Sequence, residues 1–274
     1  MAVASKARPT KRAPAKRGAG AAGELTGGDL AEVMALLRGA DSVELKLTVP
    51  QSERRSAIAA LDLDPLDAQI RQVFFLDTPE LALDQHGLVA RVRRIQGRPH
   101  DSVVKLRPVV PEHLPPELRR LPSFGVEVDA MPGGHVCSAS LKGKLGASDV
   151  RQAVTGRRPT KKLFSKEQRA FFATHAPEGV DLADLSYLGP ITVLKLKSTP
   201  QGFGRRMTTE LWFYPDGSRI LELSTKCAPA EAFQVAAEAR AFLAERDIDV
   251  TGEQQTKTRT ALEFFSGELA AATA

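Results

Sequence analysis

The segment LVARVRRIQGRPHDSVVKLR, residues 88–107, contains two stretches in which charged and apolar side chains alternate. In the first stretch Arg91 and Arg93 alternate with alanine and valine, and in the second Lys105 and Arg107 alternate with valine and leucine. Successive side chains of a β-strand point to opposite faces. This period of two therefore predicts two strands, each with one basic and one apolar face.

The same alternation recurs in five further segments, which brings the predicted number of strands to about seven. Their polar faces carry Glu44 and Lys46 (residues 43–47), Glu127 and Asp129 (126–130), Lys195 and Lys197 (193–197), Glu210 beside Trp212, and Glu222 and Lys226 (220–226). An antiparallel sheet with one solvated face is the commonest origin of such a pattern. A closed barrel accounts better for the tight pairs of like residues, because closure places all of these charges inside. We therefore expect an α+β fold in which helices surround a closed antiparallel β-barrel with a charged interior.

The predicted interior has a surplus of three positive charges. Its five acidic residues are those named above, and its eight basic residues are Lys46, Arg91, Arg93, Lys105, Arg107, Lys195, Lys197 and Lys226. Buried charges without partners are costly, so such an interior requires an anionic ligand. Arginine and lysine are the natural phosphate binders, and carboxylates hold hard cations such as Mg²⁺ that bridge phosphates. The pattern thus points to a polyanion such as triphosphate.

Composition narrows the class of protein. The chain has 274 residues, 42% of them hydrophobic and 26% charged, which is ordinary for a globular protein. Aromatic residues make up only 5%, which argues against a platform for stacking nucleic-acid bases. Cys137 and Cys227 share no local motif, which excludes a disulfide scaffold or zinc site and favours two buried thiols in a reducing compartment. The sequence has neither a membrane-spanning apolar run nor the apolar stretch of a secretory signal, so we expect a cytoplasmic protein that does not bind membranes.

The net charge of +5 is concentrated in two segments. Residues 1–20 hold six basic residues and no acid in an Ala, Pro, Lys, Arg and Gly composition, so we expect residues 1–23 to be a disordered basic tail. Residues 24–268 are expected to form one domain, with a basic and helical insertion at about 138–180. Two roles of the tail stay open: an electrostatic contact with polyphosphate or nucleic acid, and an effect on solubility alone.

Helices are also predicted outside the insertion, and familiar nucleotide motifs are absent. Apolar residues recur at helical spacing at residues 30–37 and 230–244, and further helices are expected from residue 50 onward, at 66–70 and at 253–265. The polar residues 254–259 could reach a phosphate from a helix N-terminus, but we expect them to be a solvated helix start. The sequence contains no P-loop, no nucleophile elbow and no histidine pair with metal-ligand spacing.

Several motifs resemble those of CYTH domains, the triphosphate tunnel metalloenzymes. Residues 43–46, VELK, are similar to the family's E-x-E-x-K signature. FLDTPEL at residues 75–81, followed by HGLVARVR at 86–93, is similar to the family's Y-F-D-T-P-D-L…G-L-A-L-R-x-R. The family's lysine strand, its central carboxylate pair and its late acidic strand are matched by Lys105, by Glu127 and Asp129, and by Glu222. The resemblance covers roughly residues 41–226.

The resemblance implies an eight-stranded antiparallel tunnel, dependence on Mg²⁺ or Mn²⁺, and a triphosphate-bearing substrate. The implied metal ligands are Glu44, Glu127, Asp129 and Glu222, with Glu44 and Lys46 as catalytic residues and the eight basic residues as a phosphate clamp. Two carboxylates of the family pattern are replaced by Ser42 and Ser224, so we expect weakened metal binding.

The expected function is hydrolysis of inorganic triphosphate, polyphosphate, a nucleoside triphosphate or thiamine triphosphate. Two alternatives stay open, namely cyclisation of ATP, as in class IV adenylyl cyclases, and a weakly catalytic module that binds polyphosphate or nucleotides.

Overall fold

The computed structural model describes residues 27–250 and 257–273, so the predicted tail lies outside the described residues. The strands are β1 (Ser42–Val49), β2 (Gln69–Asp77), β3 (Leu88–Ile95), β4 (His100–Leu106), β5 (Phe124–Met131), β6 (Gly134–Leu145), β7 (Ser186–Ser198), β8 (Met207–Phe213) and β9 (Arg219–Cys227). The α-helices are α1 (Gly27–Gly39), α2 (Arg54–Ala60), α3 (Ala82–Gln85), α4 (Pro116–Arg119), α5 (Asp149–Val154), α6 (Lys166–His175), α7 (Ala232–Ala244) and α8 (Lys257–Thr273). Short 3₁₀ turns are η1 (Gln51–Glu53), η2 (Pro65–Asp67), η3 (Pro111–His113), η4 (Thr160–Leu163) and η5 (Pro229–Glu231).

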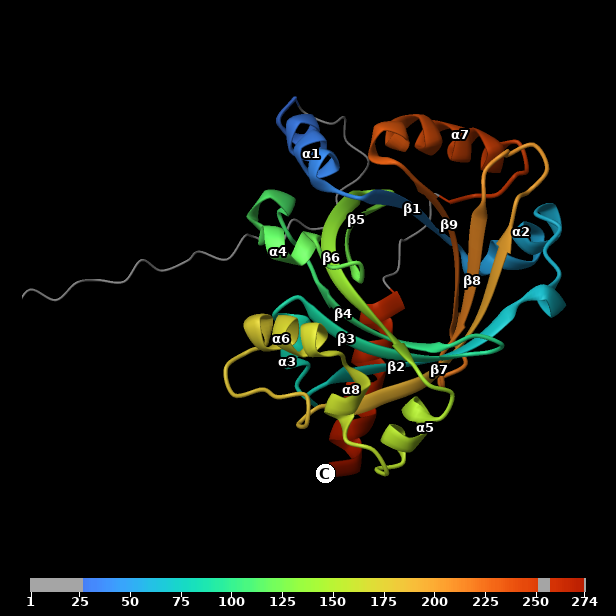
Figure 1. Cartoon of the computed structure of the whole chain (residues 1–274). Coiled ribbons are helices and arrows are strands. Elements are labelled where there is room, and N and C mark those ends of the chain that lie inside the picture. The colour runs from blue at the N-terminus through green and yellow to red at the C-terminus, as the bar shows by residue number, and fades with distance from the viewer. Residues whose placement is uncertain (1–26, 251–256, 274) are drawn as a thin grey trace, which may run out of the picture.

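The strands form one closed barrel in the order β1-β5-β6-β4-β3-β2-β7-β8-β9 (Figure 1). The predicted α+β fold, a closed barrel with a charged interior and helices around it, is confirmed. The expected eight strands and all-antiparallel pairing are wrong, since the described residues contain nine strands and β1 runs parallel to β5, with Glu44 opposite Asp129. In a closed ring an odd number of strands cannot alternate in direction throughout, so one pair must be parallel.

The alternation pattern did not predict two of the strands, β2 and β6. The last five residues of β2 are all buried, so this strand shows no alternation. Strand β6 runs to Leu145, so the insertion predicted to be helical at 138–180 begins as a strand, and its helices start only at Asp149. Serine, alanine and glycine dominate residues 138–143 of β6, and these residues favour strands little.

The other helix predictions are mostly confirmed. Helices α1 and α7 cover the segments predicted at 30–37 and 230–244, and η1 with α2 follows Pro50. Helix α8 covers the predicted segment from Lys257 onward, while residues 253–256 lie outside the described residues. The helix expected at 66–70 is wrong. There the chain makes the 3₁₀ turn η2, capped by the Asp64 side chain, and β2 begins at Gln69.

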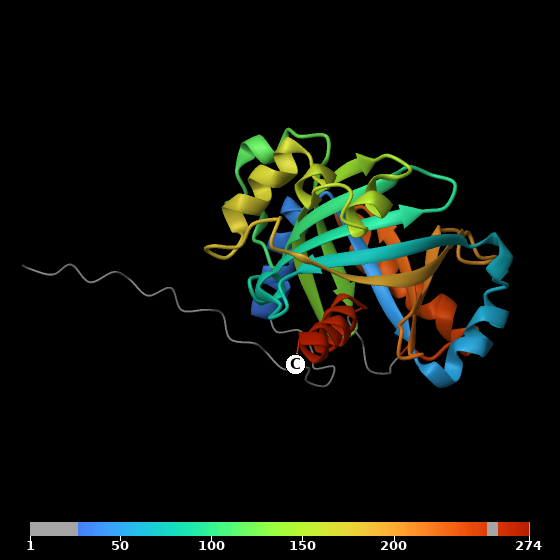
Figure 2. The ribbon, with the colours of Figure 1, turned by 90° about the horizontal axis from the view of Figure 1, so that it is seen from below.

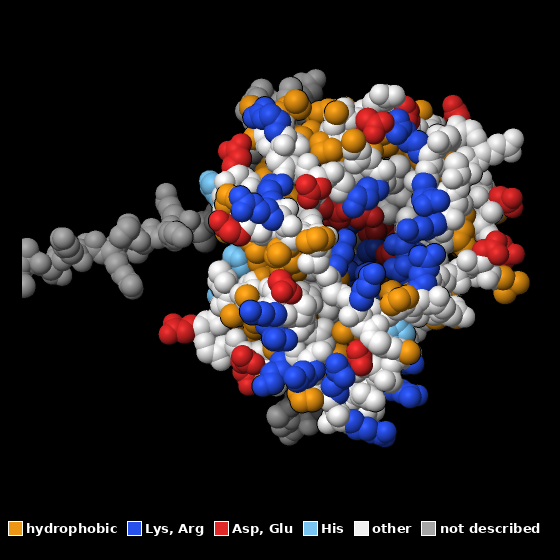
Figure 3. All heavy atoms as spheres, in the orientation of Figure 1, with side chains coloured by type: hydrophobic (Ala, Val, Ile, Leu, Met, Phe, Trp, Pro, Cys, Tyr) orange, Lys and Arg blue, Asp and Glu red, His pale blue; other side chains and the backbone are white. Residues whose placement is uncertain are grey.

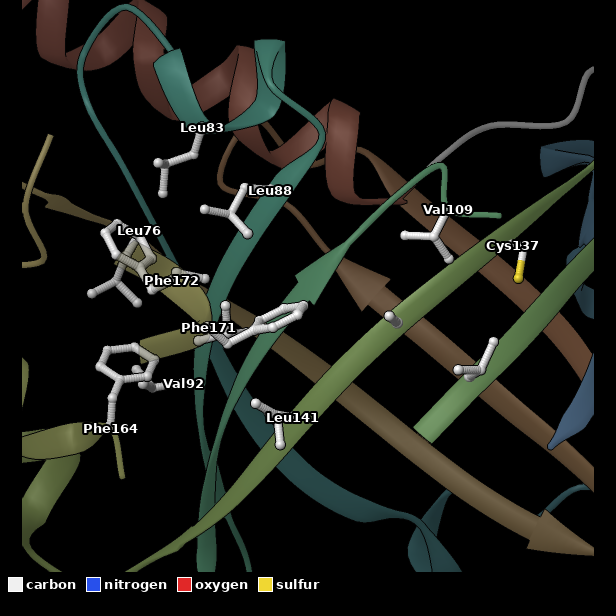
Figure 4. Close-up of a cluster of buried hydrophobic side chains, with 14 of the residues drawn as sticks. Leu76, Leu83, Leu88, Val92, Val109, Cys137, Leu141, Phe164, Phe171 and Phe172 are labelled. Carbon is white, nitrogen blue, oxygen red and sulfur yellow. The ribbon is translucent and has the colours of Figure 1, made fainter. Parts of the chain in front are cut away.

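One outer face of the barrel is buried beneath α6 (Figure 4). Val92, Val104 and Leu141 of β3, β4 and β6 belong to the same apolar cluster as Phe171 and Phe172 of α6. Buried Gln168 of α6 donates from Nε2 to the carbonyl oxygens of Ser102 and Leu141, at 3.2 and 3.1 Å. These bonds satisfy the buried amide and fix α6 on the barrel.

Helix α7 covers another part of the outer surface (Figures 1 and 2). Phe242 and Leu243 of α7 share a cluster with Leu221 and Leu223 of β9. Both cysteines, Cys137 and Cys227, are buried and free, as predicted. None of the helices in the described part of the chain combines the length and apolar character that crossing a membrane requires.

Helix α8 closes one end of the barrel. Its residues Ala261, Leu262 and Phe265 share a cluster with Val73 of β2 and Val89 of β3. Val73 and Val89 lie two positions from Arg71 and Arg91, so they belong to the inward face of their strands. The interior is therefore apolar at the end covered by α8 and charged beyond it.

Asp77, in the motif that resembles the family's D-T-P run, holds the backbone between β2 and β3. Its buried carboxylate accepts hydrogen bonds from the backbone N–H groups of Thr78, Leu83 and Asp84 at 2.8, 2.8 and 3.0 Å. The motif is thus structural, because it positions the start of β3 and with it Arg91 and Arg93.

Candidate functional site

The barrel encloses a cavity of about 540 Å³ to which all nine strands of the described residues contribute side chains. Figure 3 shows it as a hollow in which basic and acidic side chains meet. The five acidic lining residues are Glu44, Glu127, Asp129, Glu210 and Glu222, and the twelve basic ones are Lys46, Arg71, Arg91, Arg93, Lys105, Arg107, Lys142, Lys195, Lys197, Arg206, Lys226 and Lys257. The interior thus carries an excess of seven positive charges. All thirteen charged residues predicted to face the interior line this cavity.

Three carboxylates form an acidic cluster: Glu44 of β1 with Glu127 and Asp129 of β5. One oxygen of each lies within 4.8 Å of the others. The parallel pairing of β1 with β5 brings them together, since it sets Glu44 directly opposite Asp129. Such a set of hard oxygen donors is the kind that Mg²⁺ and Mn²⁺ prefer.

Three lysines neutralise this acidic cluster. Lys46 Nζ lies 2.7 Å from Asp129 Oδ1 and 3.2 Å from Glu44 Oε2, and Lys105 Nζ lies 3.1 Å from Asp129 Oδ2. Lys226 pairs with Glu127. The three acids and three lysines balance in charge.

Burial and the lysines set the protonation states in the acidic cluster. Burial raises the pKa of Asp129, but Lys46 and Lys105 outweigh it and hold that pKa at about 2. Burial is likewise outweighed by Lys46 at Glu44, whose pKa is lowered. Although burial opposes its charge, the carboxylates of Asp129 and Glu44 raise the pKa of Lys46. At Lys105 burial prevails and lowers the pKa. Asp129 is therefore a carboxylate and Lys46 an ammonium at neutral pH.

Ser42 and Ser224 point inward, as their spacing from Glu44 and Glu222 predicts, and both contact the acidic cluster. Ser42 Oγ donates to Glu127 Oε2 at 3.4 Å, and Ser224 Oγ donates to Glu44 Oε1 at 3.1 Å. Each hydroxyl thus binds a carboxylate of the cluster but adds no negative charge to it.

A second balanced group contains Glu210, Glu222, Lys195 and Lys257, which we call the quartet. Lys257 Nζ of α8 lies 2.7 Å from Glu210 Oε2 and 2.6 Å from Glu222 Oε1, and Lys195 Nζ lies 2.6 Å from Glu210 Oε1. Although burial disfavours its charge, the pKa of Glu210 lies well below its usual value because Lys257 and Lys195 outweigh burial. Glu222, predicted as a metal ligand, stands outside the acidic cluster and pairs with Lys257.

The remaining seven basic residues carry the whole positive excess, and we call them the basic clamp: Arg71, Arg91, Arg93, Arg107, Lys142, Lys197 and Arg206. Within it, Arg93 pairs with Asp101, its cross-strand neighbour, through an Nε–Oδ1 contact of 2.7 Å. Arg71 donates to the Gln69 side chain at 2.7 Å.

Arg91 has no side-chain partner among the described residues, and its Nε is buried without a hydrogen bond. Burial, reinforced by the charge of Arg93, lowers the pKa of Arg91 to about 9. The guanidinium is still charged at neutral pH, so this position is suited to an anion.

Four charged lining residues were missed as cavity residues by the sequence analysis. Lys257 was assigned to a solvated helix start, and Lys142 to the basic insertion. Arg71 lies on β2, which shows no alternation, and Arg206 directly precedes β8. No local pattern could have revealed Arg71, because β2 carries buried apolar residues on both faces.

Comparison with known proteins gives the fold a precedent. No family model matches the sequence, and no curated protein matches it significantly. A “putative adenylate cyclase” from Bacillus halodurans is 11% identical, with a TM-score of 0.56 over 80% of this chain and 97% of its own. A “putative adenylyl cyclase” from Hippeastrum, described as revealing a dominant triphosphatase activity, is 15% identical, with a TM-score of 0.55 over 77% of this chain and 91% of its own. The chain shares their fold. The closed barrel surrounded by helices, expected from the sequence, therefore has counterparts of known structure.

Proposed function

We propose that this chain is a metal-dependent hydrolase of a triphosphate-containing substrate, bound in the barrel. The observation that carries the proposal is the charge distribution of the cavity. The acidic cluster and the quartet are each neutral, so the excess of seven positive charges among the lining residues belongs to the basic clamp. Asp101 offsets one of these charges at Arg93, whereas Arg91 has no side-chain partner among the described residues. A bound triphosphate would neutralise much of this excess and give Arg91 the partner it requires.

The acidic cluster fits a divalent cation. Glu44, Glu127 and Asp129 supply oxygen donors from two adjacent strands, and Asp129 stays ionised because its pKa is about 2. When bound there, Mg²⁺ or Mn²⁺ would polarise a phosphoryl oxygen and lower the pKa of a coordinated water. Ser42 and Ser224 add no charge, which supports a weak affinity for the cation.

Lys46 acts in this proposal as a fixed positive charge rather than as a proton acceptor. Its raised pKa keeps the ammonium protonated, and its two carboxylate partners hold it in place. An ammonium so placed stabilises negative charge that develops on the phosphoryl group. Lys105, held by Asp129 at 3.1 Å, would add a second positive charge beside the cluster.

Hydrolysis is favoured over cyclisation of ATP because the described lining offers few aromatic groups that could stack on adenine. Trp212 is the one aromatic residue that lines the cavity within the described residues. Its Nε1 donates to Glu210 at 3.1 Å, and Lys257 Nζ stands 4.9 Å from its ring centroid, so its polar edge and one region of its ring already have partners. The triphosphatase activity named for the Hippeastrum protein agrees with this preference.

The direct test is phosphate release by the full chain from tripolyphosphate, thiamine triphosphate, ATP and longer polyphosphate, each with Mg²⁺, with Mn²⁺ and with EDTA. We expect release from at least one substrate, dependence on the metal, and loss of release in Arg91→Met. Formation of cyclic AMP from ATP would support the cyclase instead. No release from any substrate with either metal would overturn the proposal and leave a binding module.

A further inference from the structure

Glu210 and Glu222 are directly opposite each other on the antiparallel strands β8 and β9. Both side chains point into the barrel and are largely buried, with exposed fractions of 13% and 9%. Like charges in directly opposite cross-strand positions destabilise a sheet. This pair therefore requires a cation between the two carboxylates.

The chain itself supplies that cation. Lys257 Nζ lies within 2.7 Å of both carboxylates, and both raise its pKa despite the opposing effect of burial. The oxygens of Glu210 are occupied further, because Lys195 contacts Oε1 and the Trp212 indole N–H donates to Oε2. Little acceptor capacity is left on Glu210 for another ligand.

The position of Lys257 is fixed by its helix. Tyr214 O–H donates to the Lys257 backbone carbonyl oxygen at 3.0 Å. One turn and more along α8, Ala261 and Leu262 are buried in the cluster that closes the barrel end. The ammonium is therefore delivered to the two glutamates by a helix anchored to the barrel wall.

We propose that Lys257 serves as a built-in cation between Glu210 and Glu222, so that the cavity takes a divalent cation at the acidic cluster alone. For that cluster the inference rests on the proposed function. In this proposal Glu222 pairs with Lys257, whereas the sequence had predicted that Glu222 binds the metal. The Lys257 ammonium already contacts the Glu222 carboxylate, so a divalent ion bound by Glu222 would lie close to this positive charge. Electrostatic repulsion therefore disfavours a divalent ion at Glu222.

The test counts Mn²⁺ bound to the full chain in the absence of substrate, by calorimetry and by the electron paramagnetic resonance of free Mn²⁺. We expect one Mn²⁺ per chain for the wild type and two for Lys257→Met, which keeps the side-chain length and removes the charge. The matched control is Lys195→Met. It also removes an ammonium from Glu210 but leaves Lys257 in place, so we expect one Mn²⁺. Two ions bound by the wild type, or no gain in folded Lys257→Met, would overturn the proposal.

A second measurement decides the matter even if Lys257→Met does not fold. In the wild-type background, Glu222→Gln should change Mn²⁺ affinity by less than about 3-fold, whereas Glu127→Gln should lower it at least ~10-fold, as expected for a ligand. A loss of tenfold or more in Glu222→Gln would refute the role of Lys257. These readouts need no turnover, so failure of the proposed hydrolysis would appear separately, as absent phosphate release.

Discussion

Replacing Asp129 by asparagine removes the charge that holds two lysines inside the barrel. The Asp129 side chain is only 4% exposed and contacts Lys46 and Lys105. Its pKa falls from a usual 3.8 to about 2 in the folded chain. At 1.36 kcal/mol per pKa unit this difference contributes about 2 kcal/mol to the free energy of unfolding at neutral pH. Breaking a buried ion pair from one side costs about 3–5 kcal/mol. We therefore expect Asp129→Asn to lower the free energy of unfolding by about 2–5 kcal/mol at pH 7.

The stabilisation that Asp129 provides should decrease as the pH falls. Because the folded pKa is depressed, the contribution is full above about pH 4 and is lost as the pH falls through about 2, with roughly half left at pH 3. Urea unfolding in EDTA, followed by the fluorescence of the single tryptophan, Trp212, measures the difference between wild type and variant at several pH values. Asp67→Asn, at an exposed position, is the control and should change stability by less than about 0.5 kcal/mol. A difference for Asp129→Asn below that value, or one unchanged between pH 7 and pH 3, would refute the reasoning.

Three further outcomes are expected. Arg91→Met should weaken tripolyphosphate binding in EDTA at least ~10-fold, since hydrogen bonds to charged groups contribute about 1.5–3 kcal/mol. Calorimetry measures the affinity. The control variant Arg151→Met, at an exposed position of α5, should leave the affinity unchanged. Ser42→Glu combined with Ser224→Glu should raise Mn²⁺ affinity, because carboxylates then replace the hydroxyls beside Glu127 and Glu44; an unchanged affinity in the folded variant would contradict it. Deleting residues 1–23 should reduce the salt dependence of binding to long polyphosphate or RNA while sparing tripolyphosphate, and an unchanged salt slope would reject a role of the tail.

Alternating charges made most of the interior predictable. Strands β1, β3 and β7 show the pattern because one face meets the charged cavity and the other meets apolar helices or loops, so period two survives in the sequence. In β2 the alternation fails because Val73 and Phe75 lie where the interior is apolar, against α8, and Phe74 and Leu76 are buried on the outside. Burial on both faces erases the signal.

Contacts between segments that lie far apart in the chain could not be predicted from the sequence. The parallel pairing of β1 with β5 joins segments about eighty residues apart, and no local pattern encodes it. Lys257 illustrates the same limit. Its neighbours in sequence are polar, as in a solvated helix start, and only the docking of α8 on the barrel end brings its ammonium to Glu210 and Glu222.

The central claim is that the basic clamp binds a triphosphate inside the barrel. It is tested most directly by calorimetric titration of tripolyphosphate into the full chain in EDTA, where the metal cannot contribute. The charge distribution predicts one tripolyphosphate per chain, with a dissociation constant that rises at least ~10-fold in Arg91→Met. Absence of binding to the folded wild-type chain up to millimolar tripolyphosphate, or binding that Arg91→Met leaves unchanged, would contradict it.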